Sequence, residues 1–517
     1  MSRIDNILQR TAQRHPDGEA IVGPRRTVTW LGLEREVLMF ARQLSGLGVG
    51  RGDRIAVLSK NRIEFAALYW AAARIGAVLV PLNWRLGPIE INGILDDAKA
   101  NCVVAEPEFA VAELRETAST RTWLCLDDAP IDTTPIGQQR LGADRERNHE
   151  PAAEEIAVQM YTSGTTGRPK GAMLSHGNIT SMTAAWLAEM PLTAGADRFL
   201  QVTPLFHVGG MLMLMSCATT GATMVLHSDF SPGDVARTLH TQAITHSLMV
   251  PAMIRWLLDD LSDELSFDQL RLIIYGASPI PVPLLARAMG RFGCDFLQGY
   301  GLTETAGVLT VLRPEDHRFD PNGPLPERLS SAGRAVDGVS IRVVDPTDMA
   351  VKPGEIGEIV ATGPNVFAGY FGMPDATADA TRGGWFHTGD LATVDAEGFV
   401  TIVDRLKDMI LVGGENVYPR EVEDVLRTHP VVADVAVVGI PHDVWGEEIL
   451  AVVTTSAEPG DAKALRRALF KHARASLARF KCPTKVQVVS EIPRNSAGKV
   501  QKSALRAPYW QGRARHV

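Results

Sequence analysis

The sequence is poor in cysteine and has no excess of basic residues. Lys and Arg number 52 against 60 Asp and Glu, which gives a formal net charge of −8. The chain therefore lacks the basic footprint that is typical of proteins that bind nucleic acid, and we expect no nucleic-acid partner. No two cysteines form a CxxC pair, which is typical of small buried thiols in a reducing compartment. The five cysteines are Cys102, Cys125, Cys217, Cys294 and Cys482.

Long apolar runs are also missing. The longest, Phe65–Leu82, is interrupted by Arg74, Gly76 and Pro81. A membrane-spanning helix needs about 20 nearly uninterrupted apolar residues, so this run predicts a buried helix followed by a strand. Residues 1–18 are polar and contain no apolar segment of a signal peptide. We expect a cytoplasmic protein without an integral membrane segment; peripheral membrane contact, and the choice between monomer and homodimer, stay open.

The overall composition is that of an ordinary globular protein. The chain is 45% hydrophobic and 22% charged, and it contains 46 Gly and 31 Pro. These values exclude a disordered chain and a collagen-like or low-complexity protein. A single apolar core rarely grows beyond about 250–300 residues. A chain of 517 residues is therefore expected to form more than one domain.

Apolar, β-branched runs alternate with amphipathic stretches through about the first 400 residues. The predicted strand Arg54–Leu58 is followed by a helix, Ile63–Ile75, and by a second strand, Ala77–Pro81. Further along, the same pattern predicts the strand Thr223–Leu226 and the helix Val282–Phe292. This alternation is typical of parallel sheets that are covered by helices.

The later part of the chain has a different pattern. Residues 313–331, rich in Pro, Arg, Asp and Glu, predict a long exposed loop. From about residue 335, short strands between Gly-rich turns predict an antiparallel sheet or barrel, and the last 110 or so residues predict a small α+β unit. Residues 405–517 carry +6, and the rest of the chain carries −14. An anionic ligand bound by both parts would explain this division of charge. Solubility of the chain, or electrostatic attraction between the two parts, would also explain it.

An eleven-residue string, Tyr161–Gly171, follows the apolar run Ile156–Tyr161. Its small residues let backbone N–H groups approach an anion closely, its hydroxyls are further donors, and Lys170 adds a positive charge. The hydroxyl and glycine residues that precede Lys170 are Thr162, Ser163, Gly164, Thr165, Thr166 and Gly167. Although the spacing is not that of a Walker A loop, the string predicts a loop that grips a polyphosphate.

This string resembles the signature loop of the adenylate-forming superfamily, which comprises acyl-CoA synthetases, luciferases and the adenylation domains of peptide synthetases. Six further motifs resemble the other signatures of the superfamily and occur in the same order. They are Gln298–Thr305, Gly369-Tyr370, Phe386–Asp390, Asp404–Asp408, Gly413–Pro419 and Pro493–Lys499. The resemblance covers nearly the whole chain, and it is greatest to a fatty-acid or aryl-acid CoA ligase.

The resemblance implies an α/β fold with a division near residue 404. Residues 1–404 would form a large body that binds ATP and an acyl group, built from two helix-covered β-sheet subdomains and a small β-barrel-like region. Residues 405–517 would form a small mobile α+β domain, with Lys407 as its hinge. A few residues that absorb a backbone rotation can reposition a whole domain.

The motif Gln298–Thr305 follows a predicted strand, so its polar end is expected at the carboxyl edge of a sheet, where ligands of α/β proteins bind. A lone carboxylate beside a polyphosphate suits Mg²⁺, which typically takes one or two carboxylates and phosphate oxygens. The resemblance assigns Mg²⁺ to Glu304, the α-phosphate to Thr303, and the adenine to Tyr300. The other nucleotide-binding residues of this motif are Gln298, Gly299 and Gly301.

Other nucleotide contacts rest mainly on the resemblance. It places Gly276, Ala277 and Ser278, at the end of a predicted strand, against the adenine and the acyl group; their spacing alone is equally compatible with an ordinary turn. It assigns the ribose to Asp390, which can accept two hydrogen bonds, and to the rigid fork of Arg405.

The resemblance makes Lys499 the catalytic lysine. Attack of a carboxylate on an anionic phosphate suffers charge repulsion, and an ammonium that bridges both groups stabilises the transition state more than the separated reactants. The other residues expected to act in catalysis are Thr303, Glu304, Lys170 and His207. Coenzyme A would approach along Gly413, Gly414 and Glu415.

The acyl pocket is the least specified part of the site. His207 is as compatible with a packed core position as with the pocket wall where the resemblance places it. The expected pocket residues are His207, Val208, Gly209, Gly276, Tyr300, Gly301 and Val308. Segments 207–211, 276–278 and 300–309 contain no Arg or Lys to bind a second carboxylate. This disfavours a dicarboxylate and leaves fatty, cyclic or aryl acids.

The predicted activity is that of an acid–CoA ligase. ATP and a small carboxylic acid would form an acyl-adenylate and pyrophosphate with Mg²⁺, and coenzyme A would then displace AMP. Three alternatives stay open: an enzyme that loads a separate carrier protein, a luciferase-like oxidase, and a catalytically silent nucleotide-binding relative. Lys499, Glu304 and Asp390 argue against the silent relative.

Overall fold

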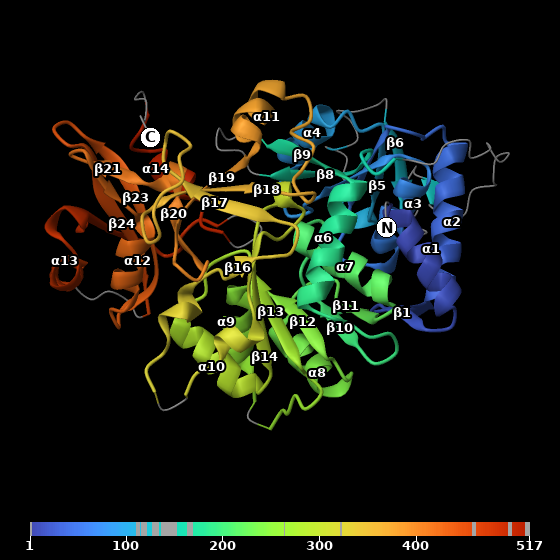
Figure 1. The fold of residues 1–517 in the computed structure, drawn as a ribbon, viewed down its shortest axis with the longest axis horizontal. Coiled ribbons are helices and arrows are strands. Elements are labelled where there is room, and N and C mark those ends of the chain that lie inside the picture. The colour runs from blue at the N-terminus through green and yellow to red at the C-terminus, as the bar shows by residue number, and fades with distance from the viewer. Residues whose placement is uncertain are drawn as a thin grey trace. The chain divides into compact units, whose positions relative to one another are not determined.

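The computed structural model describes residues 3–109, 114, 121–126, 134–135, 152–162, 169–262, 264–320, 323–456, 462–494 and 499–511 (Figure 1). The chain divides into two compact units. The first unit comprises Met1–Ile341 and Ala361–Phe386, and the second comprises Arg342–Val360 and His387–Val517.

The first unit contains a seven-stranded sheet, in the order β7-β6-β5-β3-β4-β8-β9. All neighbouring strands are parallel except β9, which is antiparallel to β8. The strands are β3 (Arg54–Leu58), β4 (Val78–Leu82), β5 (Cys102–Ala105), β6 (Thr122–Cys125), β7 (Thr134–Pro135), β8 (Ile156–Thr162) and β9 (Lys170–Ser175).

A nine-stranded sheet completes the first unit, in the order β16-β15-β14-β13-β12-β10-β11-β1-β2. Its six middle strands are parallel, and β2, β15 and β16 are antiparallel to their neighbours. The strands are β1 (Glu19–Val22), β2 (Thr27–Thr29), β10 (Arg198–Gln201), β11 (Thr223–Leu226), β12 (His246–Met249), β13 (Leu272–Gly276), β14 (Asp295–Tyr300), β15 (Thr310–Leu312) and β16 (Arg334–Ala335).

Helices cover both faces of the two sheets. The helices of the first unit are α1 (Ile4–Arg14), α2 (Trp30–Gly46), α3 (Ile63–Arg74), α4 (Pro88–Asp97), α6 (His176–Glu189), α7 (Val208–Thr220), α8 (Pro232–Thr241), α9 (Pro251–Asp260), α10 (Val282–Phe292) and α11 (Pro374–Ala380). One core joins α1, α2, α3, α6 and α7 to one face of each sheet. The other face of the seven-stranded sheet packs on α4, and that of the nine-stranded sheet packs on α8, α9 and α10. The predicted helix-covered sheets are confirmed.

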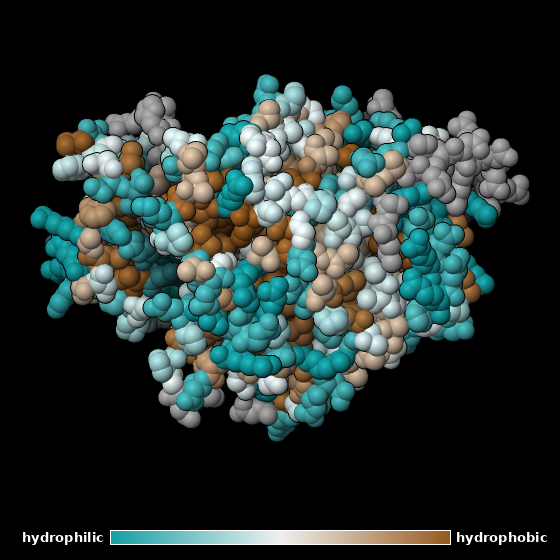
Figure 2. Space-filling model, viewed as in Figure 1, coloured by the Kyte–Doolittle hydropathy of each residue, from teal (hydrophilic) through white to brown (hydrophobic). Residues whose placement is uncertain are grey.

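The ends of these helices follow local sequence rules. Thr29 caps α2 by accepting a hydrogen bond from the Gly32 backbone N–H, and Ser175 caps α6 in the same way. Helices α7 and α10 end at glycines with positive φ, Gly221 and Gly293. On the solvent side α2 is hydrophilic (Figure 2), as expected for an amphipathic helix packed on a sheet. Among the described residues, no helix has the length and apolar character needed to cross a bilayer.

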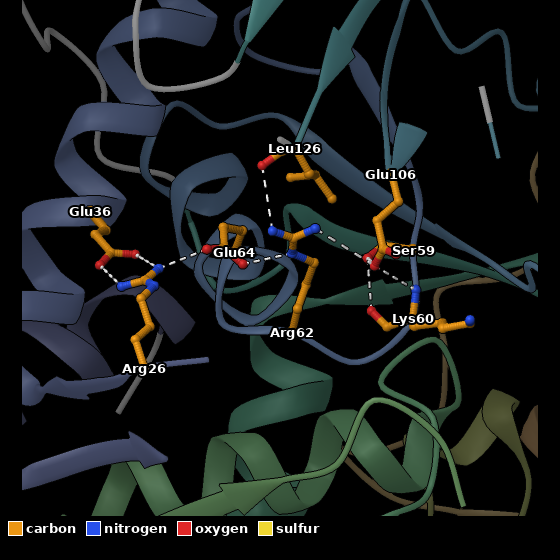
Figure 3. Close-up of polar contacts among 8 residues, drawn as sticks. All are labelled: Arg26, Glu36, Ser59, Lys60, Arg62, Glu64, Glu106 and Leu126. Atoms are coloured by element: carbon orange, nitrogen blue, oxygen red, sulfur yellow. Dashed lines mark hydrogen bonds and ion pairs between the residues drawn. The ribbon is translucent and has the colours of Figure 1, made fainter. Parts of the chain in front are cut away.

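A ladder of alternating charges joins α2 and α3 to the ends of β3 and β5 (Figure 3). Arg26 pairs with Glu36 of α2 and with Glu64 of α3, its Nη2 lying 2.8 Å from Glu64 Oε1. Arg62 continues the ladder to Glu64 and Glu106, whose Oε1 also accepts a hydrogen bond from the Ser59 hydroxyl. Partly exposed ion pairs contribute below about 1 kcal/mol each, so the ladder serves mainly to orient these elements.

The segment 313–331 differs from its prediction as an exposed loop. It contains two 3₁₀ helices, η3 (Pro314–His317) and η4 (Glu327–Ser330), and buries Asp316, His317 and Leu329. The His317 imidazole contacts the Tyr275 hydroxyl at 2.9 Å, and burial lowers the pKa of His317. Glu315, Arg318 and Glu327 are exposed, as the charge content predicted. Asp316 is the exception, since it is buried 3.8 Å from Arg328 and from Arg334.

The second unit combines two small sheets. The first has the order β17-β18-β19-β20 and consists of β17 (Ser340–Val344), β18 (Gly357–Thr362), β19 (Phe386–Val394) and β20 (Val400–Arg405). The second consists of β21 (Ile410–Val412), β22 (Glu415–Val417), β23 (Val432–His442), β24 (Gly446–Thr455) and β25 (Lys485–Val488). Its faces are covered by α12 (Pro419–Arg427), α13 (Ala462–Ser476) and α14 (Lys502–Arg506). The remaining 3₁₀ helices are η1 (Pro107–Phe109), η2 (Thr303–Thr305), η5 (Arg382–Gly384), η6 (Leu406–Asp408) and η7 (Arg479–Lys481).

Candidate active site

The predicted phosphate loop connects β8 to β9. Thr162 ends β8, Lys170 begins β9, and the two residues are directly paired in the antiparallel ladder. The loop therefore leaves and rejoins the sheet at one point, with a hydroxyl on one side and an ammonium on the other. Its predicted phosphate-binding residues Ser163, Gly164, Thr165, Thr166 and Gly167 lie outside the described residues.

Glu304 lies beside the two ends of this loop. It follows β14 in the 3₁₀ helix η2, next to Thr303, and only 6% of the residue is exposed. Its Oε1 accepts hydrogen bonds from the Tyr370 hydroxyl at 2.9 Å and from Thr162 Oγ1 at 3.4 Å. Lys170 Nζ lies 4.8 Å from the centre of the Tyr370 ring. Burial, followed by the charge of Glu304, raises the pKa of Tyr370, so its hydroxyl remains a donor.

The carboxyl ends of β13 and β14 lie side by side in the nine-stranded sheet. Gly276 pairs with Gly299, and a Cβ added to Gly276 would lie 2.4 Å from the Gly299 carbonyl oxygen. Gly301 is similarly crowded, since its Cβ would lie 2.5 Å from the Gly307 carbonyl oxygen. Ala277 adopts a positive φ of 65°. The backbone itself therefore forms this edge, with Ser278 exposed beyond it and Gln298 and Tyr300 on β14.

Gly276→Ala is expected to destabilise the first unit by about 1–3 kcal/mol, because the added methyl group must push β13 and β14 apart. The matched control is Gly290→Ala, within α10, where an added Cβ meets nothing within 4 Å. That substitution is expected to stabilise by about 0.5–1 kcal/mol. Urea unfolding measures both changes, and an equal effect of the two substitutions would contradict the crowding at Gly276.

Several predicted acyl-pocket residues gather around Gly299 and Gly307. A Cβ on Gly307 would lie 3.2 Å from Leu212 and 3.8 Å from Val208, and a Cβ on Gly299 would lie 3.5 Å from Trp186 and 3.7 Å from Val308. His207 is at the N-cap position of α7, just before Val208, and its ring centre lies 4.5 Å from that of Phe206. Gly209 faces Leu248. The structure thus brings the valines, the glycines and the start of α7 together.

The predicted ribose residues form a pair in the second unit. Asp390 of β19 and Arg405 of β20 are directly opposite each other, and Arg405 Nε lies 2.6 Å from Asp390 Oδ1. Only 3% of Asp390 is exposed, whereas the Arg405 side chain is 41% exposed. The guanidinium therefore offsets the buried charge of Asp390.

The predicted hinge and coenzyme A residues lie further along the same unit. Lys407 is an exposed residue of the 3₁₀ helix η6, and partial desolvation lowers its pKa. Gly413 and Gly414, with φ of 61° and 90°, form the two-residue turn between β21 and β22, and Glu415 begins β22. Two positive φ values in succession require glycine-like residues, which explains the Gly-Gly pair.

Lys499 lies where the chain reverses direction near its end. Arg494 and Val500 form an antiparallel bridge, and the Gln501 N–H donates to the Pro493 carbonyl. The Lys499 residue is exposed. Three residues later, Lys502 Nζ lies 2.8 Å from Glu423 Oε1, with only 13% of either side chain exposed. The segment that carries Lys499 is thus anchored by a buried ion pair.

Comparison with known proteins decides the family. The family model described as "AMP-binding enzyme" matches residues 8–371, and the model of the "AMP-binding enzyme C-terminal domain" matches residues 421–499. The chain belongs to the AMP-binding enzyme family. The resemblance found in the motifs is therefore confirmed.

Relatives of this AMP-binding enzyme match along nearly its full length. The feruloyl-CoA synthase of an Amycolatopsis species is 38% identical over 509 residues, or 96% of this chain and 97% of the relative. The fatty acid–[acyl-carrier-protein] ligase ScoC of Streptomyces coeruleorubidus is 35% identical over 531 residues, or 100% and 98%.

Solved structures of o-succinylbenzoate CoA synthetase (MenE) from Bacillus subtilis share the fold. The complex with its acyl-adenylate intermediate OSB-AMP has a TM-score of 0.85 at 31% identity and covers 97% of both chains. The complex with ATP and magnesium ion has a TM-score of 0.84 at 30% identity, with 97% of this chain and 99% of the other covered. The predicted fold class and the predicted enzyme class, an AMP-forming acid–thiol ligase, are confirmed.

The solved structure of MenE with ATP and a magnesium ion, and the feruloyl-CoA synthase, agree with the predicted use of ATP, Mg²⁺ and coenzyme A. Glu304 fits a magnesium ion, because Mg²⁺ is usually held by one or two carboxylates and the phosphates of the substrate. The carboxylate already lies against both ends of the phosphate loop through Thr162 and Tyr370. When bound there, the ion would neutralise charge on the phosphates.

Two residues of this AMP-binding enzyme were not assigned a role from the sequence. Tyr370 belongs to a recognised motif, Gly369-Tyr370, so a signal existed, but nothing in the motif indicates a contact with Glu304, 66 residues away. Lys502 gave no signal at all, since a lysine near the end of a chain is usually solvated. Both contacts depend on tertiary packing.

Proposed function

We propose that this ligase activates an apolar monocarboxylic acid, which is fatty, cyclic or aryl. The observation that supports this proposal is the wall formed by Val208, Leu212 and Val308 around Gly299 and Gly307. The wall segments 207–211, 276–278 and 300–309 contain no Arg or Lys. A second carboxylate buried there without a partner would cost several kcal/mol.

In the first half-reaction, a carboxylate oxygen attacks the α-phosphorus of ATP and the bond to pyrophosphate breaks. Thr303 and the phosphate loop, with Lys170 at its end, hold the phosphates, and Glu304 holds Mg²⁺. Lys499 bridges the carboxylate and the α-phosphate, which reduces the repulsion between two anions. Asp390 and Arg405 hold the ribose, and Tyr300 flanks the adenine beside the glycine-lined edge.

In the second half-reaction, the sulfur of coenzyme A attacks the acyl carbonyl, the thiol proton is lost and AMP leaves. Residues 405–517 rotate about Lys407 between the two steps. This rotation removes Lys499 from the reacting groups and brings the Gly413-Gly414-Glu415 turn next to the thiol of coenzyme A. The 3₁₀ helix at residues 406–408 is compatible with a short pivot. A cytoplasmic location, and a monomer or homodimer, remain predictions.

A panel of acids tests the proposed substrate class. Ferulate, benzoate, decanoate and cyclohexanecarboxylate are each incubated with the enzyme, ATP, Mg²⁺ and coenzyme A, with 2-succinylbenzoate as the dicarboxylate. At least one monocarboxylate is expected to form its thioester about 100-fold faster than the dicarboxylate, since an unpaired buried carboxylate is costly. Thioester mass and AMP release are measured. Turnover of the dicarboxylate alone would overturn the proposal.

One observation supports a second candidate acceptor. ScoC, which is named a ligase for acyl-carrier protein, matches the full length of this chain. The carrier would supply the same thiol chemistry on a pantetheine arm. Measuring AMP release with coenzyme A as the only thiol distinguishes the two acceptors. Rapid AMP release would show that free coenzyme A is an acceptor. Release only after a carrier protein is added would favour the second candidate.

A further inference from the structure

Tyr370 is held along the strand that leaves the phosphate loop. Its segment runs antiparallel to β9: Tyr370 bridges Ala172, and the Phe371 N–H donates to the Gly171 carbonyl at 2.8 Å. The Ala368 N–H and the Gly369 carbonyl make two further hydrogen bonds with Met173. The backbone of Tyr370 is therefore hydrogen-bonded alongside β9, next to the point where the phosphate loop joins that strand.

The Tyr370 ring is also fixed. Only 9% of the residue is exposed, and the ring packs edge-on against Phe367 with their centres 4.8 Å apart. Phe367 packs in the same manner against Phe386, and its N–H donates to the Glu304 carbonyl at 2.8 Å. A ring packed in this way has little rotational freedom, so the position of its hydroxyl is set by the fold.

This fixed ring contacts two groups that the proposed mechanism uses, Glu304 and Lys170. Its hydroxyl donates to Glu304 Oε1 at 2.9 Å, and its face lies 4.8 Å from Lys170 Nζ. The same Glu304 oxygen accepts the weaker bond from Thr162, at 3.4 Å. Thr162 and Lys170 are the two ends of the phosphate loop. Thr162 contacts the Glu304 carboxylate directly, and Tyr370 links Lys170 to the same carboxylate.

We propose that Tyr370 is a positioning residue that orients the Glu304 carboxylate toward the metal of Mg·ATP and holds Lys170 at the end of the phosphate loop. The inference rests on the proposed role of Glu304 as the magnesium ligand. A carboxylate that is oriented in advance loses less freedom when the ion binds. Removing a hydrogen-bond partner of a metal ligand typically weakens metal affinity about 10–100-fold.

The test is Tyr370→Phe, which removes the hydroxyl but keeps the ring that packs on Phe367 and lies under Lys170. Equilibrium binding of Mg·ATP to the full chain is measured by calorimetry without acid or coenzyme A, and AMP serves as a ligand that carries no β- or γ-phosphate. We expect Mg·ATP to bind about 10-fold more weakly and AMP to bind as in the unchanged protein. If Tyr370 had a purely structural role, the substitution would weaken the binding of Mg·ATP and of AMP equally. That result would overturn the inference.

Two companion variants separate the possible failures. Glu304→Gln is expected to weaken Mg·ATP at least as much as Tyr370→Phe does. If Glu304→Gln weakens the binding of Mg·ATP and Tyr370→Phe does not, the role of Tyr370 is overturned while that of Glu304 stands. If neither variant weakens the binding of Mg·ATP, both roles are overturned. The matched control is Tyr69→Phe. It removes another buried tyrosine hydroxyl, which donates a hydrogen bond to the Leu205 carbonyl oxygen at 2.7 Å. It is expected to lower the melting temperature without changing the ratio of Mg·ATP to AMP affinity.

A third variant tests the contact with Lys170. Tyr370→Leu removes the ring as well as the hydroxyl, so it also releases the ammonium that lies over the ring face. We expect this variant to bind ATP more weakly than Tyr370→Phe even when no metal is present, by about 3-fold, as the loss of a cation–π contact implies. Equal ATP affinities of the two variants without metal would remove Lys170 from the inference.

Discussion

Replacing Lys499 by alanine is expected to slow adenylation at least about 100-fold, which is the typical effect of losing one preorganised charged contact. The reaction brings a carboxylate and the α-phosphate together, and the ammonium reduces their repulsion most strongly in the transition state. Thioester formation from supplied acyl-adenylate needs no such contact and is expected to be largely spared. The two half-reactions are measured separately, by ATP–pyrophosphate exchange and by thioester yield from the acyl-adenylate.

The control for Lys499→Ala is Lys471→Ala, an exposed lysine of α13 in the same unit. Both substitutions remove one positive charge from the second unit, so a general loss of electrostatic attraction would affect the two variants alike. Equal losses in both half-reactions of Lys499→Ala, or similar losses in the two variants, would contradict the assigned role.

Lys502→Met is expected to destabilise the second unit by about 3–5 kcal/mol, because it leaves a buried carboxylate without its cation. Lys502 Nζ lies 2.8 Å from Glu423. Burial alone would lower the pKa of Lys502, but the charges of Glu423, Asp404 and Asp408 outweigh it and raise that pKa. The ammonium is therefore charged throughout the neutral range. Calorimetry should show the melting transition of this unit lowered by about 10 °C.

The control for Lys502→Met is Lys485→Met on β25. Lys485 Nζ lies 2.6 Å from Glu448, but the lysine side chain is 55% exposed, and such pairs contribute below about 1 kcal/mol. Adding Glu423→Gln to Lys502→Met should restore much of the lost stability, since it removes the unpaired charge. Similar small shifts for both lysines, or no recovery in the double variant, would contradict the buried ion pair.

Local patterns in the sequence were sufficient for most of the secondary structure. The predicted strands Arg54–Leu58 and Thr223–Leu226 and the predicted helix Val282–Phe292 have the bounds found in the structure. These segments are apolar runs bordered by turn or capping residues. The residues that border a segment therefore determine where the strand or helix begins and ends. The prediction of an exposed loop at 313–331 was correct only in part: Glu315, Arg318 and Glu327 are exposed, but Asp316 and His317 are buried.

The candidate site divides in the same way. By itself, the sequence was sufficient to predict which residues carry the chemistry: the phosphate loop, Glu304, Asp390 and Lys499 stand in motifs whose residues are neighbours in the chain. Only the tertiary structure decided how those groups are supported, through Tyr370 on Glu304 and Lys502 on Glu423. The partners in these pairs are 66 and 79 positions apart. Their contact depends on strand register and on packing between elements, which no local pattern specifies.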